Sequence, residues 1–461
     1  MNGRMLWEKK HAMNMNDVAI AFYYSKETRY SVHALLSAID ISDLNVDVYL
    51  ISEDDLVLNK VFALTRMYKV VVFGFTLFTT SLHKLLWITK FLTKSKPKNL
   101  LLIAGGPYAT GDPVGALTLG FDIVFVGESE RSLTEFLREV IERGDPLRIQ
   151  GIAYREDGDF FFNGKPEPID LNKYPPFPYW RRKFNPIEIT RGCPFQCGYC
   201  QTPYIHGFIL RHRNVENVTK YAEIFWKHGL RDLRFITPNA LAYGSLDGIR
   251  PNVNALVELL SSLRVLKEKY GGRVFMGSFP SEVRPEFLNY DLAKLLKEHV
   301  DNRKIIIGAQ SGSKKILRLL RRGHTVDDVL EAVKAALKVG FKVDVDFIFG
   351  LPGETEEDIE ETLKLMEKLV RMGVRIHAHT FIPLPGSPLE NAPPGKIPLK
   401  IKKYLMKIYG KGKLYGDWLK QERIAEIVHE LRVKGVIRTR ERWKLKIGRG
   451  YNVRLVTYQY I

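Results

Sequence analysis

The 461-residue sequence predicts an α/β protein in which two series of parallel strands follow one another along the chain. Short apolar runs alternate with amphipathic helical stretches over most of its length, the pattern of strand–helix–strand crossover units. A Pro-rich interval divides the two series, and the last 66 residues differ sharply in charge. We therefore expect a first domain at 1–150, a linker at 151–186, a second domain at 187–395 and a basic α+β extension at 396–461.

The first series predicts a doubly wound, Rossmann-like sheet. Its strands read as nearly continuous apolar segments, which indicates that helices cover both faces of the sheet. We expect these strands at 18–24, 46–51, 70–75, 99–106 and 122–127. After them, Gly158 and Gly164 are typical of a hairpin, and the segment KYPPFPYW, with Pro175, Pro176 and Pro178, is typical of a crossing between domains.

The second series predicts a (βα)6 partial TIM barrel, or a complete one. Its strands are separated by helical stretches long enough for crossover connections. We expect the strands at 186–192, 233–237, 274–279, 304–310, 343–350 and 375–384. Barrels of this kind place their chemistry at the carboxyl ends of the strands, so the residues that follow each strand are the candidates for a site.

Composition argues against several classes of protein. With 45% apolar residues the chain can bury a large core, so disorder is excluded as its dominant state. No apolar run approaches the roughly 18 residues that a membrane span needs, and the N-terminus has no signal-peptide core. The three cysteines fall within eight residues, which argues against a disulfide framework. We expect a cytoplasmic protein, and its six glutamines beside abundant Lys, Arg and Glu are typical of heat-adapted proteins.

The three cysteines form the strongest motif of the chain. Cys193, Cys197 and Cys200 have the spacing C-x3-C-x2-C directly after the first strand of the second series. Three thiolates can converge on one soft metal centre, but a closed structural zinc site or a four-cysteine cluster needs one more ligand. One coordination position would therefore stay open to a substrate or cofactor. The alternative is a zinc or redox site with a fourth ligand from elsewhere, such as His206 or His212.

The segment TRGCPFQCGYC resembles the motif of the radical S-adenosylmethionine (SAM) superfamily. The resemblance implies a [4Fe–4S] cluster whose unique iron chelates SAM, and cleavage of SAM to a 5′-deoxyadenosyl radical. It also implies a one-electron donor of the flavodoxin or ferredoxin type. In this family the aromatic residue before the third cysteine, here Tyr199, packs near the adenine.

Four later segments match the pattern of this superfamily in order: FITPNA (235–240), GSFPSEVRPE (277–286), GAQSGS (308–313) and GLPGETEED (350–358). Gln310 stands where the pattern usually has Glu, which keeps hydrogen bonding but removes a charge. The glycines of the last segment admit close approach of a ligand, and Thr355 with Asp358 predicts a capping box. The resemblance implies SAM-binding roles for Tyr199, Thr237, Asn239, Ser278, Glu282, Arg284, Gln310, Ser311, Gly350, Leu351 and Pro352.

Residues 100–137 resemble the cobalamin (B12)-binding domain that precedes many radical SAM domains, which identifies the chain as similar to class B of the superfamily. Ligands of such sheets lie at the carboxyl ends of the strands. We expect cobalamin contacts from Thr76, Thr79, Thr80, Ser81, Gly105, Gly106, Pro107, Gly127 and Glu128. The loop after the first strand, YYSKETRYSVH, lacks the Asp-x-His-x-x-Gly motif, so we expect no histidine ligand to cobalt. The alternative is a degenerate α/β domain kept for docking.

The extension at 396–461 holds 18 Lys and Arg against five acidic residues, so +13 of the chain's formal +18 lies there. A helix is predicted over 418–435, closed by Gly435, and a hairpin over 436–460. Cations at alternate positions of its first strand, about 6.6 Å apart, would form a ridge able to follow the phosphates of RNA. The ridge residues are Arg438, Arg440, Arg442, Lys444 and Lys446. A solvated face, anionic lipid head groups and a polyanionic coenzyme are the alternatives.

The resemblance implies a cobalamin-dependent methyltransferase that acts on an unactivated carbon, with RNA as one candidate substrate. A radical SAM rearrangement or C–C coupling of a small molecule or lipid, with cobalamin absent or a spectator, is the first alternative. A non-catalytic iron–sulfur RNA-binding protein is the second. Methylthiolation by the familiar route is disfavoured, because it needs a second cluster and no further cysteines remain.

Overall fold

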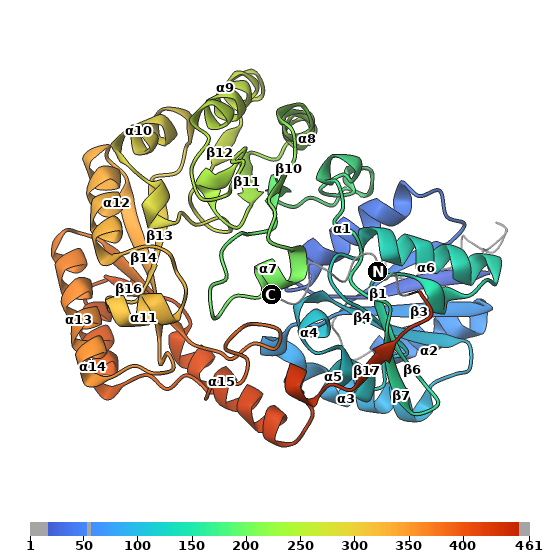
Figure 1. Ribbon diagram of the computed structural model, residues 1–461. Coiled ribbons are helices and arrows are strands. Elements are labelled where there is room, and N and C mark those ends of the chain that lie inside the picture. The colour runs from blue at the N-terminus through green and yellow to red at the C-terminus, as the bar shows by residue number, and fades with distance from the viewer. Residues whose placement is uncertain (1–16, 53–56, 451–461) are drawn as a thin grey trace, which may run out of the picture.

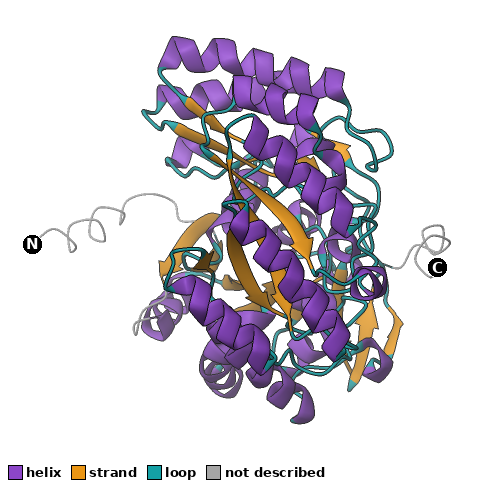
Figure 2. Ribbon diagram, turned by 90° about the vertical axis from the view of Figure 1, so that its left-hand side faces the viewer, coloured by secondary structure: helices purple, strands orange, loops and turns teal. Residues whose placement is uncertain are grey.

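The computed structural model describes residues 17–52 and 57–450, which form two α/β units side by side (Figure 1). The first unit is a wide sheet and the second is a partial barrel. In both, helices enclose the strands (Figure 2). None of the helices in the described ranges is long and apolar enough to cross a membrane.

The first unit contains an eight-stranded sheet in the order β17-β7-β6-β5-β4-β3-β1-β2. Its parallel strands are β1 (Val18–Tyr24), β2 (Asp47–Ser52), β3 (Val70–Thr76), β4 (Leu100–Gly105) and β5 (Ile123–Phe125). Helices α1 (Arg29–Asp40) and α6 (Glu130–Glu142) bury their apolar residues on one face of this sheet. The other face is covered by α2 (Val57–Met67), α3 (Leu82–Ser95), α4 (Gly106–Gly111) and α5 (Pro113–Thr118). The predicted doubly wound sheet is therefore confirmed.

The hairpin predicted after this series is formed by β6 (Ile152–Glu156) and β7 (Asp159–Phe162). Strand β6 pairs antiparallel with β5, so the first sheet extends past residue 150, where the sequence places the domain boundary. Strand β17 (Leu445–Ile447), from the end of the chain, then pairs parallel with β7. One strand of the extension is thus part of the first sheet.

The second unit contains six βα strands in two hydrogen-bonded groups, confirming a partial barrel. The first group is β8 (Ile187–Glu188), β11 (Asp232–Ile236) and β12 (Arg273–Phe275), and the second is β13 (Lys304–Gln310), β14 (Lys342–Phe349) and β15 (Arg375–Thr380). Backbone bonds connect the groups, with Ile306 N donating to the carbonyl of Gly277 and Val283 bridging Ile307. A short strand of the extension, β16 (Leu414–Tyr415), pairs with β15 at the edge.

Helices cover the outside of the barrel because each carries one apolar stripe that packs on the strands. They are α8 (Val215–Lys227), α9 (Val253–Tyr270), α10 (Tyr290–His299), α12 (Val326–Lys338) and α13 (Glu356–Arg371). Helix α11 (Lys314–Leu319) instead packs in a small apolar cluster with Leu351 and Phe381. The capping box predicted at the start of α13 is confirmed: Asp358 N donates to Thr355 Oγ1, and Thr355 N donates to the Asp358 carboxylate. A second capping box, Thr325 with Asp328, opens α12.

In the extension, α14 (Leu399–Tyr409) packs beside α13, and α15 (Trp418–Val433) packs on β15 and on the turn at Thr79–Ser81 of the first unit. The predicted helix over 418–435 is confirmed. The predicted strand over 436–447 is wrong in its first part, where Arg440–Arg442 form a 3₁₀ turn. The reason is tertiary: the carboxylates of Asp112 and Glu390, both distant in the sequence, accept the backbone N–H groups of Arg438 and Arg440 that a strand would use for pairing. The predicted second strand lies outside the described residues.

Candidate functional site

The cysteine loop lies at the mouth of the barrel, between the antiparallel pair β9 (Thr190–Arg191) and β10 (Arg211–His212), and it leads into α7 (Thr202–His206). Gly192 opens the loop with a φ of +91°, and a Cβ there would lie 2.2 Å from the carbonyl oxygen of Ile209. Only glycine fits this position. At the far side, Gly198 N donates to the carbonyl of Leu320, which ties the loop to the segment after α11.

Two buried arginines face the sulfur of Cys197. Nη1 of Arg284 lies 3.8 Å and Nη1 of Arg322 lies 3.5 Å from Sγ, and Arg322 also donates to the hydroxyl of Tyr199 at 3.1 Å. The Arg284 guanidinium stacks on the ring of Phe195, 3.5 Å from its centroid. Positive charge at this distance stabilises thiolate sulfur and any anionic centre that it ligates. The sequence predicts Arg284 as a site residue but not Arg322.

The three sulfurs are not grouped as the ligands of a single ion would be. A tetrahedral zinc ion holds thiolates about 3.8 Å apart. Among the described residues, which include all three cysteines, these sulfurs do not form a group whose ligand atoms all lie within 4.8 Å of one another. They are nevertheless neighbours: burial, with smaller contributions from Cys200 and Cys197, raises the pKa of the Cys193 thiol to about 11.

The cysteines line a cavity of about 510 Å³, within the size range of small-molecule sites. Five of the predicted SAM residues line it too: Tyr199, Thr237, Glu282, Arg284 and Gln310. The structure adds Arg322, Asp346 and His379 from the barrel, Gln421 from α15 of the extension, and Thr80 from the first unit. The cavity therefore combines three thiols with polar side chains from five further barrel strands or from the loops that follow those strands.

The other predicted SAM residues lie outside this lining. Asn239 accepts a hydrogen bond from the backbone N of Arg284, and the hydroxyl of Ser311 bonds that of Thr362. At Gly350, φ is +72° and a Cβ would lie 2.5 Å from the backbone nitrogen of Lys396. Chain packing alone therefore requires glycine at this position, and its role at SAM stays a prediction. Ser278 is buried, Leu351 packs in a small apolar cluster, and Pro352 follows it.

Gln310 has a strained backbone at the cavity wall. Its φ is +70°, where residues other than glycine are uncommon, and the register between β13 and β14 shifts between Gly308 and Gln310. Strain of this kind persists where the surrounding structure holds a residue in place, and it occurs often at functional sites. The bulge positions Gln310 at the cavity wall.

The histidines considered as a fourth zinc ligand do not line the cysteine cavity. His212 bonds Thr190 Oγ1 through Nδ1 and the carbonyl of Ser245 through Nε2. His206 lines a different cavity, at the edge of the first sheet. The structure therefore gives no support to the alternative of a zinc site completed by either residue.

The second cavity, of about 250 Å³, lies at the carboxyl ends of β1, β3, β4 and β5. Six predicted cobalamin residues line it: Thr76, Gly105, Gly106, Pro107, Gly127 and Glu128. Phe22, Phe75, Ile103 and Phe125 supply apolar walls, and Arg191, Ile205 and His206 come from the barrel unit. Thr80 lines the cysteine cavity instead, and Thr79 and Ser81 line neither of the two.

The glycines of this edge differ in their role. A Cβ on Gly106 would lie 2.9 Å from Thr76 Cγ2, so that glycine is required by chain packing. A Cβ on Gly105 would meet nothing closer than 3.8 Å, so a side chain there would enter free space at the cavity floor. The floor of the cavity at Gly105 is therefore open to a ligand. His33, on α1 at the end of the segment that lacks the cobalt-ligand motif, bonds Tyr24 and Asn185 and does not line the cavity.

Glu128 also connects the two units. Its carboxylate accepts from Arg211 Nη1 at 2.9 Å and lies 3.4 Å from Arg191, whose guanidinium is also paired with Glu130 at 2.7 Å. Burial opposes ionisation of Glu128, but His206, Arg211 and Arg191 hold its pKa well below the usual value. The segment V-G-E-x-E, residues 126–130, thus holds β9, the strand that leads to the cysteine loop. Sequence reasoning missed this ion network, because its arginines lie over sixty residues away.

Two cations of the predicted ridge are paired within the protein. The Arg440 guanidinium donates to the carbonyl of Gly386 and pairs with Glu390, and Lys446 pairs with Asp159 at 2.5 Å. Lys444 is exposed, and the side chain of Arg442 lies outside the description. RNA binding by these residues stays a prediction.

A model of the Radical SAM superfamily matches residues 187–366, the segment that carries the cysteine loop and five of the six barrel strands. These residues form a radical SAM domain. A radical SAM domain implies a [4Fe–4S] cluster and SAM, and enzymes with this domain need an electron donor. The cysteine cavity, which has three thiols and a polar wall, fits that pair of cofactors.

Known proteins resemble the chain beyond the radical SAM domain. An uncharacterized protein of Methanocaldococcus jannaschii is 33% identical over 215 residues, which cover 45% of this chain and 41% of that protein. An uncharacterized methyltransferase of Pyrococcus horikoshii is 27% identical over 334 residues, 68% of each chain. The structure of the radical SAM methyltransferase TsrM from Kitasatospora setae, with cobalamin and a [4Fe–4S] cluster bound, superposes with a TM-score of 0.63. It is 14% identical and covers 81% of this chain and 74% of TsrM, so it shows the shared fold.

Proposed function

We propose that the protein is a cobalamin-dependent radical SAM methyltransferase that acts on an unactivated carbon. The observation that carries the proposal is the arrangement of the two cavities. Thr76 lines the cavity of the first sheet, and Thr80, four residues later, lines the cysteine cavity. Gln201, next to Cys200, donates to the carbonyl of Pro107. Cofactors in the two cavities would therefore lie next to each other, as transfer between them requires.

The radical SAM domain supplies, when loaded, a 5′-deoxyadenosyl radical that abstracts hydrogen, and cobalamin supplies a methyl carrier. The residues of this chain bind and orient these groups. The three cysteines hold the cluster, while Arg284 and Arg322 offset its negative charge at Cys197. Cobalamin in TsrM and the methyltransferase name of the Pyrococcus relative support the assignment. RNA is left out of the proposal, because Arg440 and Lys446 are paired within the protein.

The proposal is tested by filling the floor of the first cavity. Gly105 has an extended backbone with a φ of −144°, so Gly105→Leu adds a side chain without strain. We expect this variant to lose the cobalamin absorbance of the reconstituted protein, and to lose methyl transfer, while it keeps its cluster and still cleaves SAM. Gly410→Leu is the matched control, since Gly410 has a φ of −59° and open surroundings far from both cavities.

Two results would contradict the proposal. One is cobalamin binding by Gly105→Leu equal to that of the wild type. The other is a wild-type protein that binds no cobalamin yet turns over its substrate, which would favour the alternative of a rearrangement or coupling enzyme. Cluster content, measured on the same samples, separates loss of the cavity from loss of the fold.

A further inference from the structure

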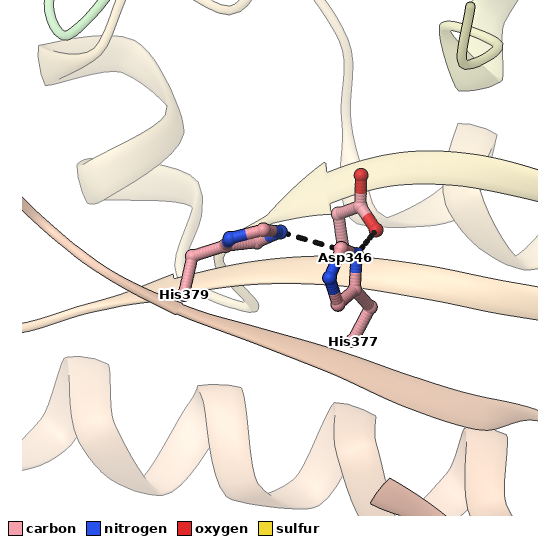
Figure 3. Close-up of side chains that lie close together, drawn as sticks. All are labelled: Asp346, His377 and His379. Carbon is pink, nitrogen blue, oxygen red and sulfur yellow. Dashed lines mark hydrogen bonds and ion pairs between the residues drawn. The ribbon is translucent and has the colours of Figure 1, made fainter. Parts of the chain in front are cut away.

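A second group of ligand-type side chains lies in the cysteine cavity. Asp346 is on β14, and His377 and His379 are on the neighbouring strand β15 (Figure 3). Asp346 and His377 are paired in the parallel register, and His379 is two residues further on, so all three point from the same face of the sheet. Asp346 and His379 line the cavity that also contains the cysteines.

The ligand atoms are spaced as on one metal ion. Nδ1 of His377 lies 2.8 Å from Oδ1 of Asp346 and 3.1 Å from Nε2 of His379. Ligands about 2.1 Å from a divalent ion lie about 3.0 to 3.4 Å apart in octahedral or tetrahedral geometry. A neutral imidazole nitrogen bonds in one direction only, so Nδ1 of His377 does not satisfy both neighbours well without an ion between them.

The charges around the group also favour a cation. Among the described residues, no lysine or arginine bonds Asp346, since Lys304 and Arg375 both bond Asp344 one layer below. Glu282 brings a second carboxylate to the cavity wall. Both arginines of the cavity are instead turned to Cys197. A cation bound at this group would pair with the Asp346 carboxylate, which no lysine or arginine of the described residues bonds.

Neighbouring side chains hold the two imidazoles in place. The ring of His377 stacks on that of Tyr415, with centroids 4.1 Å apart and planes 2° apart. The side-chain amide of Gln421 lies 3.3 Å from Nδ1 of His379 and accepts the backbone N–H of Thr380 at 2.8 Å. Such outer contacts orient the rings of metal-binding histidines.

We propose that Asp346, His377 and His379 bind one divalent transition-metal ion, distinct from the iron–sulfur cluster, in the wall of the same cavity. Two imidazoles and one carboxylate suit Zn²⁺, Fe²⁺ or Co²⁺. Three protein ligands leave positions that face the cavity, where an oxygen or nitrogen donor of the substrate would bind. This inference does not rest on the proposed methyl transfer, and it is tested without it.

The test uses the full chain with all three cysteines replaced, Cys193→Ala, Cys197→Ala and Cys200→Ala, so that no cluster forms. The metal-free protein is titrated with Co²⁺. We expect one Co²⁺ per chain, with the visible absorption of a protein-bound ion, and its displacement by Zn²⁺. Adding His377→Ala and His379→Ala should weaken Co²⁺ binding by more than about 100-fold, beyond the loss typical of second-sphere changes.

The matched control adds His228→Ala and His429→Ala, two exposed histidines away from the cavity, and should bind Co²⁺ as the parent does. Since removal of the cysteines could unfold the chain, a second measurement uses the reconstituted wild type, which should hold one metal ion per chain more than its His377→Ala/His379→Ala variant. Equal metal content in that pair, or Co²⁺ binding unchanged by the histidine substitutions, would overturn the proposal. The group would then be a hydrogen-bonded chain from Gln421 to Asp346.

Discussion

At the scale of single residues, the site depends on charge placed next to one sulfur. Arg322 is buried and uses its guanidinium for Cys197, Tyr199 and the carbonyl of Gly308. Arg284 approaches the same sulfur from the loop after β12. Both positive charges reach Cys197, so a cluster bound there sits in a local field that favours the added electron.

The first prediction concerns this field. Arg322→Met removes one positive charge beside Cys197 with little change in side-chain length. Because the reduced cluster is the more negative form, we expect its reduction potential to become more negative and SAM cleavage to slow by about tenfold or more, the effect of 1.4 kcal/mol. The measurement is a redox titration followed by electron paramagnetic resonance. Arg318→Met, an exposed change on α11, is the control and should leave the potential unaltered; an unaltered potential in Arg322→Met would contradict this explanation.

At the scale of elements, helix α13 is fixed by its first turn. Asp358 accepts the backbone N of Thr355 in the capping box, and its other oxygen accepts from Ser313 Oγ at 2.6 Å. Lys315 pairs with it at 2.6 Å. The carboxylate thus joins α13 to the loop that follows β13, the strand that ends at Gln310. Burial opposes ionisation of Asp358, yet Lys315, Ser313 and Thr355 hold its pKa well below the usual value.

The second prediction is that Asp358→Ala lowers the free energy of unfolding by about 2 kcal/mol, since it removes a helix cap and a charge-assisted hydrogen bond. Chemical denaturation monitored by circular dichroism measures the change. Asp327→Ala is the control, because Asp327 is exposed in the first turn of α12 and does not form that helix's capping box. An effect of Asp358→Ala no larger than that of the control would show that the cap does not stabilise α13.

Local sequence patterns predict a contact when its residues lie close together in the sequence, and they miss it when the residues lie far apart. The capping box of α13 could be predicted because Thr355 and Asp358 are three residues apart. The pairing of β17 with β7 could not, because it joins residues near 446 to residues near 161 and both strands are short. Arg322 was missed for the same reason: it reaches the cysteines through a turn at Arg321, which has a φ of +53°, and no spacing in the sequence marks it.

At the scale of the whole molecule, the extension contacts the first unit through Asp112. Its buried carboxylate accepts from the backbone N of Arg438 at 2.6 Å, from Gly115 N at 2.8 Å and from Tyr108 Oη at 3.1 Å. The indole of Trp443 donates to it as well. Burial raises the pKa of Asp112 to about 6, although these donors oppose the shift. The contact between the extension and the first unit is therefore expected to depend on pH.

The third prediction follows from that pKa. A carboxyl group with a pKa of about 6 when folded and about 3.9 when unfolded holds its proton more tightly in the folded state. Its contribution to stability therefore increases as pH falls from about 7 to about 4, by up to about 3 kcal/mol. Asp112→Asn has no such group. We expect the unfolding free energy of the wild type, relative to this variant, to rise over that pH interval, and a difference that is constant with pH would contradict the assignment.

The central claim, a cluster held by three cysteines that activates SAM, is tested most directly by assaying 5′-deoxyadenosine formation by the anaerobically reconstituted, reduced protein. The wild type should hold about four irons per chain more than the variant lacking all three cysteines and should form 5′-deoxyadenosine from SAM. Cys197→Ala, which removes the sulfur that faces Arg284 and Arg322, should lose the cluster and the product together. A Cys197→Ala protein that assembles the same cluster and still cleaves SAM would contradict the account.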